Sequence, residues 1–439
     1  MSQRTSSVDL KFKKRVHATF DAKCISADAG VLLLGQLDSK LGLTKRLAES
    51  VRDKRRGLVE HTMAELVSAR VLAIAQGYED CNDFKELRKD PLFQTTVGEV
   101  GRELASQPTL SRFENATTLE DMVAMKSVLL EHFIARHRRE GTTPKRLTLD
   151  VDSTDDKTHG QQEFSAFNGF YDSYVYLQLL VTTAEGDLLH VALMPPKLNL
   201  RSRAVMAIDE VVTRLRQEWP RLELRLRADN GFATPDMYSL CERHRVEYFI
   251  NAGSHAVFQE APTTVEALAH AEKEYQADES RTVMVYAEMR HQAKSWDVER
   301  RIVIKAQRTP VGPDMRFLVT NSKLTPKGVY EEYSQRGQAE NFIKDFKRGV
   351  LGDRLSCHRF AANALRLLLH AVAYQLMHEL RRLATDGLRV ARLETLRLVV
   401  LRVAALVTAT ARRLRVQMSQ AFPHRSEWVH LAAAISAIG

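Results

Sequence analysis

The sequence predicts an α/β protein in which a mixed sheet is flanked by two helical regions. Apolar residues recur at three- and four-residue spacing over residues 30–140 and again from residue 358 onward, which is typical of helices. Between these regions, three strand-like segments are followed by a helix, a strand, a helix and a strand. This order is typical of mixed α/β domains.

The strands are predicted from the alternation of apolar and polar residues. In residues 144–154, "PKRLTLDVDST", the residues Leu147, Leu149 and Val151 alternate with polar ones, as in a strand with one buried face. The core continues with strands at 174–183, 187–197, 222–232 and 246–253, and with helices at 203–219 and 234–245. The region 254–323 then has the pattern of antiparallel strands at 281–290, 296–307 and 315–321.

The composition is ordinary for a soluble globular protein with two to four structural units, at 439 residues, 44% hydrophobic and 27% charged. The most apolar stretch, residues 396–415, contains Arg397 and Arg402, so we expect a buried helix there and not a membrane span. The first residues lack the apolar segment of a secretory signal. Four scattered cysteines without a CxxC pair fit a reducing cytosol better than zinc or disulfide sites.

The net charge of +9 is concentrated toward the C-terminus. Residues 341–439 contain 16 Lys plus Arg against 6 Asp plus Glu, so the first 340 residues are close to neutral. Nearly all of these cations are arginines, whose planar guanidinium suits phosphate. The pattern indicates a polyanionic partner, most often nucleic acid, although a helical bundle with solvated arginines would have the same composition.

These patterns together predict five successive regions. They are an N-terminal helical region (1–143), the first part of an α/β core (144–253), a β-rich insertion (254–323), the second part of the core (324–380) and a basic C-terminal helical region (381–439). Within the first region, residues 104–116 predict a short helix after a polar turn. Such a helix can read DNA or can simply pack.

Three acidic residues stand at positions suited to metal-dependent chemistry. Asp152 and Asp229 each close a predicted strand, and Glu340 lies on the helix predicted after the insertion. Strand ends are where sites gather in open α/β sheets. Carboxylates from two strands and a helix can hold Mg²⁺, and two ions about 4 Å apart can support phosphodiester chemistry. An aspartate at a strand end can equally be a turn residue.

The segment 333–347, "YSQRGQAENFIKDFK", predicts a helix with a polar stripe beside its buried face. On a helical wheel, Tyr333, Arg336, Glu340 and Lys347 fall within about 60° of one another. The stripe joins one aromatic ring and two cations to one of the three carboxylates. An ordinary solvated surface is the alternative interpretation.

The spacing Tyr-x2-Arg-x3-Glu-x6-Lys in residues 333–347 resembles the signature of bacterial insertion-sequence transposases with a DDE catalytic triad. The blocks "DSTDDKTHGQQEFSAFNGFY" (152–171) and "RADNGF" (227–232) are similar to the two aspartate blocks of one branch of this family. The resemblance covers roughly residues 20–380. It implies a ribonuclease-H-like catalytic core (144–253 and 324–380) that is interrupted by the β-rich insertion, and an N-terminal DNA-binding region (1–143). It also implies a cut-and-paste reaction through a DNA hairpin.

The same resemblance implies that Asp152, Asp229 and Glu340 are the catalytic residues and the ligands of two Mg²⁺ ions, for which Mn²⁺ can substitute. Asp150 lies on the same predicted strand face and is the second choice for the first ligand. Asp152 is preferred because a Ser/Thr pair follows it, as in the family. Three further polar residues are expected to shape the next loop: Asp155, Asp156 and His159.

DNA contacts are implied for the same helix. Tyr333, Arg336 and Lys347 would bind phosphate near the transposon end, and Lys344 would add a further cation. These side chains would hold the DNA backbone while the carboxylates act on the scissile bond.

The insertion contributes a second set of candidate DNA contacts. A base flipped out of the stack needs an aromatic surface, and Trp296 is the candidate; its alternative role is to pack the β-rich insertion. Nearby Arg300 and Arg301 would hold phosphate or remain solvated.

The partners implied are double-stranded DNA, both terminal inverted repeats and target DNA, and a second copy of the chain in a homodimeric synaptic complex. A bacterial cytoplasmic location at the nucleoid is expected, with no membrane partner. Two other functions stay open: a catalytically silent DNA-binding regulator derived from a transposase, and a stand-alone Mg-dependent nuclease that cuts DNA without joining it.

Overall fold

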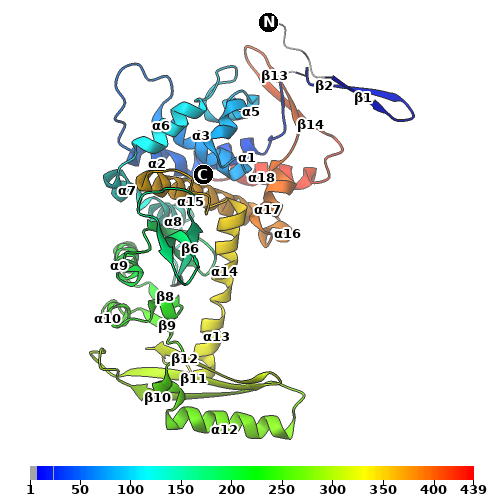
Figure 1. The fold of residues 1–439 in the computed structure, drawn as a ribbon. Helices are drawn as coiled ribbons and strands as arrows, with labels where there is room; N and C mark the ends of the chain where they lie inside the picture. Colours follow the sequence, from blue (N-terminus) through cyan, green and yellow to red (C-terminus); the bar gives the residue numbers. More distant parts are fainter. Residues whose placement is uncertain (1–6, 23) are drawn as a thin grey trace. The chain divides into compact units, whose positions relative to one another are not determined.

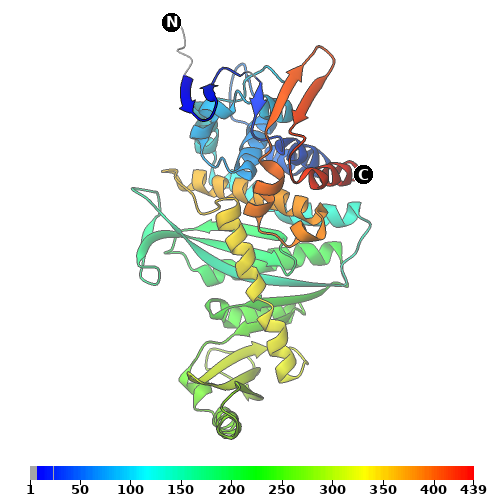
Figure 2. The same ribbon diagram turned by 90° about the vertical axis from the view of Figure 1, so that its right-hand side faces the viewer.

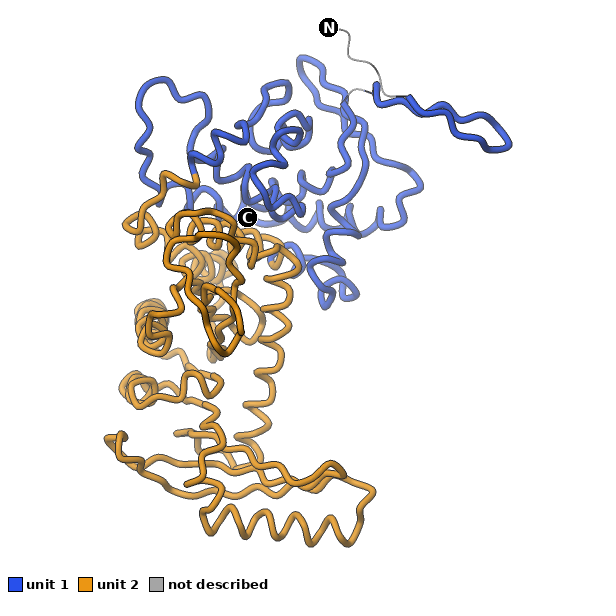
Figure 3. Tube along the Cα trace, in the orientation of Figure 1, with its two compact units in different colours: residues 1–113, 379–439 blue, residues 114–378 orange. Residues whose placement is uncertain are grey.

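The computed structural model describes residues 7–22 and 24–439 and divides into two compact units (Figure 3). Unit 1 consists of residues 1–113 and 379–439, and unit 2 consists of residues 114–378. The two ends of the chain therefore contribute to the same unit. None of the helices in the described ranges has the length and hydropathy that a bilayer span requires.

Unit 1 is mainly helical and has two small sheets (Figure 1). Its N-terminal helices are α1 (Val31–Leu41), α2 (Leu43–Ser50), α3 (Met63–Gln76), η1 (Cys81–Asp83), α4 (Phe84–Leu87), α5 (Pro91–Val97) and α6 (Gln107–Ala116), whose end belongs to unit 2. Its C-terminal helices are α16 (Asp386–Arg389), α17 (Leu393–Leu396), η4 (Arg397–Leu401) and α18 (Arg425–Ser436). Its strands are β1 (Ser7–Lys11), β2 (Arg15–Thr19), β3 (Ile25–Ser26), β13 (Ala405–Ala409) and β14 (Leu414–Met418).

The helices predicted over residues 30–140 are confirmed, and local chemistry explains their starts. Helix α3 begins with a capping box, in which the Thr62 hydroxyl accepts a hydrogen bond from the Glu65 backbone N–H and the Glu65 carboxylate accepts one from the Thr62 N–H. Helix α6 begins at Gln107, within the predicted 104–116 segment. The β1–β2 hairpin was not predicted.

The buried helix predicted over residues 396–415 is wrong. After the π-helix η4, the chain forms the hairpin β13–β14, and β13 also pairs with β3. Ala405 and Val407 are buried while Leu406 is exposed, which is the two-residue period of a strand. A short apolar run does not distinguish helix from strand, so pairing with a segment about 380 residues away decides the structure here.

Unit 2 is built around a large mixed sheet. Its helices are α7 (Leu119–Met125), α8 (Val128–Arg139), α9 (Leu200–Glu218), η2 (Asn230–Phe232), α10 (Pro235–Arg243), α11 (Ala256–Gln259), α12 (Pro262–Ala277), α13 (Pro326–Ser334), α14 (Gly337–Lys344), η3 (Asp345–Gly349) and α15 (Phe360–Leu383), whose end belongs to unit 1. Its strands are β4 (Arg146–Lys157), β5 (Ala166–Asn168), β6 (Ser173–Thr183), β7 (Leu188–Met194), β8 (Glu223–Ala228), β9 (Glu247–Asn251), β10 (Val283–His291), β11 (Arg300–Thr309) and β12 (Gly312–Thr320).

The sheet confirms the mixed α/β prediction. Its nine strands run in the order β10-β11-β12-β9-β8-β4-β6-β5, with β7 paired to β6. Strand β4 is parallel to β8 and antiparallel to β6, and β8 is parallel to β9. The predicted sequence of three strands, helix, strand, helix and strand corresponds to β4, β6, β7, α9, β8, α10 and β9, with the short β5 in addition.

The main core of unit 2 lies between this sheet and its helices. Buried side chains from β4, β6 and β8 pack with those of α8, α9 and α10 in one cluster. Strand β6 is buried from Val175 to Thr183, as expected for a strand covered on both faces. Figure 2 shows α13 and α14, in yellow, crossing the strands of this unit.

The insertion forms the predicted antiparallel strands β10, β11 and β12, but they do not make a separate sheet. Strand β12 pairs with β9 through Leu318, Val319 and Thr320, so the insertion extends the central sheet. The region also contains the 16-residue helix α12, which was not predicted and which contacts β10 and β11. This contact buries Ala271 and Tyr275 in a small core with Val283.

Candidate active site

Two of the predicted carboxylates lie side by side where β4 and β8 separate. The last parallel pair between these strands is Val151 with Ala228, and Asp152 and Asp229 are the next residue on each strand. The prediction that Asp152 ends its strand is only partly right, because β4 continues to Lys157 in pairing with β6. The end of pairing with β8 is what places Asp152 beside Asp229.

Backbone donors orient both carboxylates. Asp229 Oδ1 accepts a hydrogen bond from the Gly231 N–H at 2.8 Å, which caps the short helix η2. Asp152 Oδ1 accepts one from the Ser153 N–H at 3.0 Å. Each aspartate therefore has one oxygen held by the backbone, while its second oxygen lies within 4 Å of Arg336.

A single guanidinium nitrogen lies between these second oxygens. Arg336 Nη2 is 2.7 Å from Asp152 Oδ2 and 3.8 Å from Asp229 Oδ2. The side chains of Arg336 and Asp152 are 12% and 13% exposed, so water screens this pair only weakly. Arg336 thus balances the charge of both aspartates from the start of α14.

Glu340 acts on the same site through its charge. Burial raises the pKa of Asp152 to about 6; Arg336 opposes this rise, and the negative charges of Asp229 and Glu340 add to it. The charges of Asp229 and Glu340 thus both act on Asp152. Over residues 7–22 and 24–439, no group of three or more His, Cys, Asp or Glu side chains is arranged to hold a metal ion.

The carboxylate oxygens of the two aspartates are ligands that suit a hard divalent cation. One oxygen of each aspartate already lies near the same positively charged group. In this arrangement the group is the Arg336 guanidinium. Glu340 is exposed on α14, in the first turn of that helix.

The continuous helix predicted over residues 333–347 is wrong. Helix α13 ends at Ser334, Gln335 and Arg336 form a turn, and α14 begins at Gly337. The Arg336 N–H bonds to the Tyr333 carbonyl and the Ala339 N–H to the Arg336 carbonyl, which are three-residue steps. After Lys344 the helix widens into the π-helix η3. Glycine favours the break because it is a poor helix former.

Two other signature residues, Lys347 and Tyr333, also lie against the central sheet. Lys347 Nζ donates to the Asp155 carbonyl at 2.7 Å and lies 3.2 Å from its carboxylate. Tyr333 packs beside the small cluster around Phe249, and burial raises the pKa of its phenol. The side chains of Arg336, Lys347 and Tyr333 thus contact residues of the central sheet, whereas the side chain of Lys344 is exposed.

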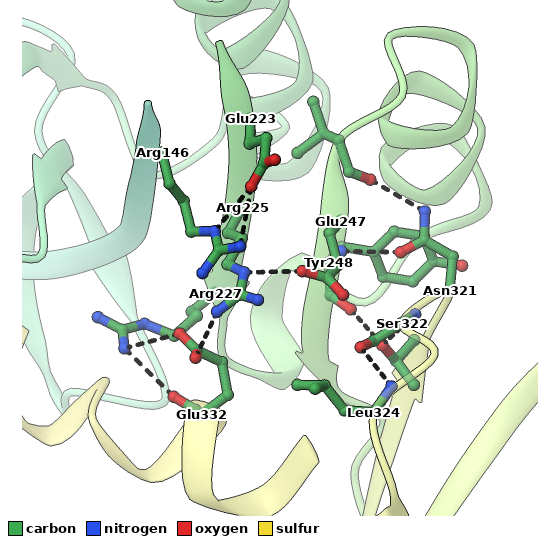
Figure 4. A network of polar contacts seen from close by, with 12 residues as sticks. Arg146, Glu223, Arg225, Arg227, Glu247, Tyr248, Asn321, Ser322, Leu324 and Glu332 are labelled. Atoms are coloured by element: carbon green, nitrogen blue, oxygen red, sulfur yellow. Dashed lines mark hydrogen bonds and ion pairs between the residues drawn. The ribbon is translucent and has the colours of Figure 1, made fainter. Parts of the chain in front are cut away.

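Helix α13 is attached to the sheet by an ion-pair network that sequence reasoning missed (Figure 4). Arg225 on β8 binds Glu332 of α13 at 2.6 Å and Glu247 of β9 at 2.7 Å. Arg227 donates to the Glu332 carbonyl at 3.2 Å. The alternation of arginines with apolar residues in β8 was the sequence feature that could have indicated this network. The network positions the turn that carries Arg336.

Asp150 is engaged elsewhere. Both of its oxygens accept hydrogen bonds from Arg227, each at 2.7 Å, and both side chains are 1% exposed. This buried bidentate pair leaves Asp152 as the aspartate of β4 that faces Asp229 and Arg336.

The insertion residues are committed to structural contacts. Arg300 is buried, binds Glu242 and Asp297 at 2.7–2.8 Å, and lies over the rings of Tyr238 and Trp296. Trp296 packs against the main core and makes an edge contact with Tyr238. These contacts match the packing role that the sequence left open for Trp296.

Arg301 has a similar environment. It pairs with Glu288 and donates to the carbonyl groups of Ser322 at 2.6 Å and Leu324 at 2.9 Å. It is therefore neither solvated nor directed at open solvent.

Asp155 and Asp156 were expected in a loop but lie on β4, and only His159 follows its end. Asp156 is 1% exposed, and burial raises its pKa to about 8, with a 3.3 Å hydrogen bond from Gln178 opposing the rise.

Asp156→Asn is expected to remove a pH-dependent loss of stability. Because the folded-state pKa lies above the unfolded one, folding retains a proton, and stability present at low pH is lost as the pH rises toward 8. The loss is roughly 1.4 kcal/mol per pH unit over this window. Thermal unfolding at pH 5 and pH 8 should show a smaller fall for Asp156→Asn than for wild type. The exposed Asp172→Asn serves as control, and equal falls in all three proteins would contradict the assignment.

The fold and site first define a class: mixed α/β proteins whose acidic residues gather at the ends of adjacent parallel strands. Residues 8–439 match the family described as Transposase DDE domain group 1, so the chain belongs to this family and is a DDE-type transposase. DDE transposases generally use divalent metal ions.

Among solved structures, the cryo-EM structure of the piggyBac transposase synaptic complex with hairpin DNA is similar at a TM-score of 0.41 and 10% sequence identity. The similarity covers 79% of this chain and 74% of that one. No curated protein matches the chain.

Proposed function

We propose that the chain cuts the ends of an insertion sequence and joins them to target DNA, with Asp152, Asp229 and Glu340 as catalytic carboxylates on a ribonuclease-H-like core. Family membership supports the reaction class. The observation that carries the site assignment is the position of Arg336 Nη2 between the carboxylates of Asp152 and Asp229. Glu340 is included because its charge raises the pKa of Asp152.

Asp152 and Asp229 would hold Mg²⁺ through the oxygens that now face Arg336, and Glu340 would complete the ligand set of two ions. When bound, Mg²⁺ activates the attacking oxygen and stabilises the leaving one. Arg336 would then leave its place between the aspartates and become available to a phosphate, which its planar guanidinium binds well. Tyr333, Lys344 and Lys347 are proposed to contact DNA on the same side of the site.

The proposed substrate is double-stranded DNA with terminal inverted repeats, and the proposed reaction passes through a DNA hairpin intermediate. The active form would be a homodimer in the bacterial cytoplasm. The acidic and carbonyl partners of Arg300 and Arg301 favour a structural role for both residues. DNA contacts by these arginines and by Trp296 are therefore not included in the proposal.

A DNA fragment containing the gene with its natural flanks tests this function. The full chain with Mg²⁺ should cut at inverted repeats and yield fragments joined to a target plasmid, and EDTA should abolish both products. Denaturing gels would show a hairpin end as a strand of doubled length. Binding without cutting would support the regulator instead, and cutting without joining would support the nuclease.

A further inference from the structure

Unit 2 has a cluster of exposed aromatic rings that the proposed chemistry does not use. Six Phe, Tyr or Trp side chains are exposed in the described parts of the chain. Four of the six lie within residues 164–174, which we call the aromatic hairpin: Phe164, Phe167, Phe170 and Tyr174. Such clustering of exposed apolar surface marks interaction sites.

The hairpin presents these rings in a defined arrangement. Phe167 on β5 pairs directly with Tyr174 on β6, and their rings meet edge to face at 5.8 Å. Phe170 lies at the turn and is 88% exposed, and its backbone N–H donates to Asn168 Oδ1 at 3.0 Å. The Phe170 ring contacts Tyr171 at 4.9 Å. The turn is therefore held by hydrogen bonds while its rings face outward.

A basic segment lies against the base of the hairpin. Gln162 Nε2 donates to the Leu355 carbonyl at 2.8 Å, and the Glu163 N–H donates to the His358 carbonyl at 2.9 Å. The segment 344–359 contains five Lys plus Arg and two Asp. The segment that adjoins the hairpin is thus basic, with three more cations than carboxylates.

The hairpin also lies within electrostatic reach of the candidate active site. Burial raises the pKa of Tyr171, and the charges of Asp155, Asp229 and Asp152 raise it further. Strand β6 carries Tyr174 of the hairpin and pairs with Asp152 through Leu180, so the hairpin and Asp152 belong to the same strand pair.

We propose that the aromatic hairpin binds unpaired bases of the DNA beside the reaction centre, by stacking on Phe167, Phe170 and Tyr174. The proposal rests on the proposed function, since it takes DNA as the substrate. Aromatic rings next to cations are the usual means by which proteins hold single-stranded nucleic acid. Trp296 was the aromatic residue expected to receive a base, and its ring is partly buried and packs against the main core of unit 2. The hairpin supplies such a surface on a different element.

Binding of a labelled 20-nucleotide oligothymidine to the full chain tests the proposal, with a 20-base-pair duplex as the comparison. Phe170→Leu keeps an apolar side chain but removes the stacking face. It should raise the Kd for the single strand roughly tenfold and leave the Kd for the duplex within about twofold. Phe170→Trp should restore single-strand binding, which a purely structural role would not predict.

Met206→Leu is the control, because Met206 on α9 is 52% exposed and lies outside the hairpin. An unchanged Kd for Phe170→Leu, equal losses on single strand and duplex, or an equal loss for Met206→Leu would overturn the proposal. A changed oligomeric state of the DNA-free Phe170→Leu protein would instead identify the hairpin as a contact between copies. Because the assay measures binding alone, it is separate from the cleavage test of the proposed function.

Discussion

Asp152→Asn is expected to lower the rate of DNA cleavage by about 10³-fold or more, since it removes one charge from a site whose members act as a unit. The substitution keeps the shape of the side chain, so the loss would come from the missing carboxylate. Glu340→Gln should have an effect of similar size. The double variant should be little worse than either single variant, because groups that act together are not additive.

The measurement is single-turnover cleavage of the end-containing fragment, with thermal unfolding to verify that each variant is folded. Glu185→Gln changes an exposed carboxylate of the turn between β6 and β7 and should leave the rate unchanged. If Asp152→Asn retained more than a tenth of the wild-type rate, Asp152 would not be the first catalytic carboxylate.

Arg227→Met is expected to destabilise unit 2 by roughly 3–5 kcal/mol, because Asp150 would remain buried without its counterion. For a unit of this size, the thermal midpoint should fall by roughly 5–15 °C. Replacing both partners, as Asp150→Leu with Arg227→Met, should recover most of the loss, since a buried ion pair and an apolar pair are often similar in stability.

Arg146→Met is the matched control. Arg146 pairs with Glu223 at 2.8 Å in the same sheet (Figure 4). The two side chains are 53% and 65% exposed. An exposed pair contributes roughly 1 kcal/mol or less, so the midpoint should move little. Equal shifts for Arg227→Met and Arg146→Met would show that burial does not set the energy of the Arg227 pair.

The strand and helix order of unit 2 could be predicted because alternation and helical periodicity are local properties. Leu147, Leu149 and Val151 identify β4 without reference to the rest of the chain. The break between α13 and α14 was missed because the helical periodicity of residues 333–347 was given more weight than Gly337, a poor helix former. Glu332 and Arg336, next to the break, contact strands about 100 residues earlier or more. Helical periodicity around Gly337 does not report such contacts.

The candidate site was only partly predictable for the same reason. Asp152, Asp229 and Glu340 were selected by residue type, position and resemblance, and their convergence remained an expectation. The guanidinium between the first two was interpreted as a DNA contact, although its partners in the structure are carboxylates. Asp150 and Asp152 share a strand face in the sequence, and only the presence of Arg227 separates their environments.

The sequence by itself determined the mixed α/β class, the order of the core elements and the acidic residues worth testing, because each is written in short-range patterns. The tertiary structure alone decided which charges neutralise one another, where β13 finds its partner β3, and that β12 extends the central sheet. Those outcomes depend on pairs far apart along the chain, whose free energy comes from burial and proximity that no local pattern records.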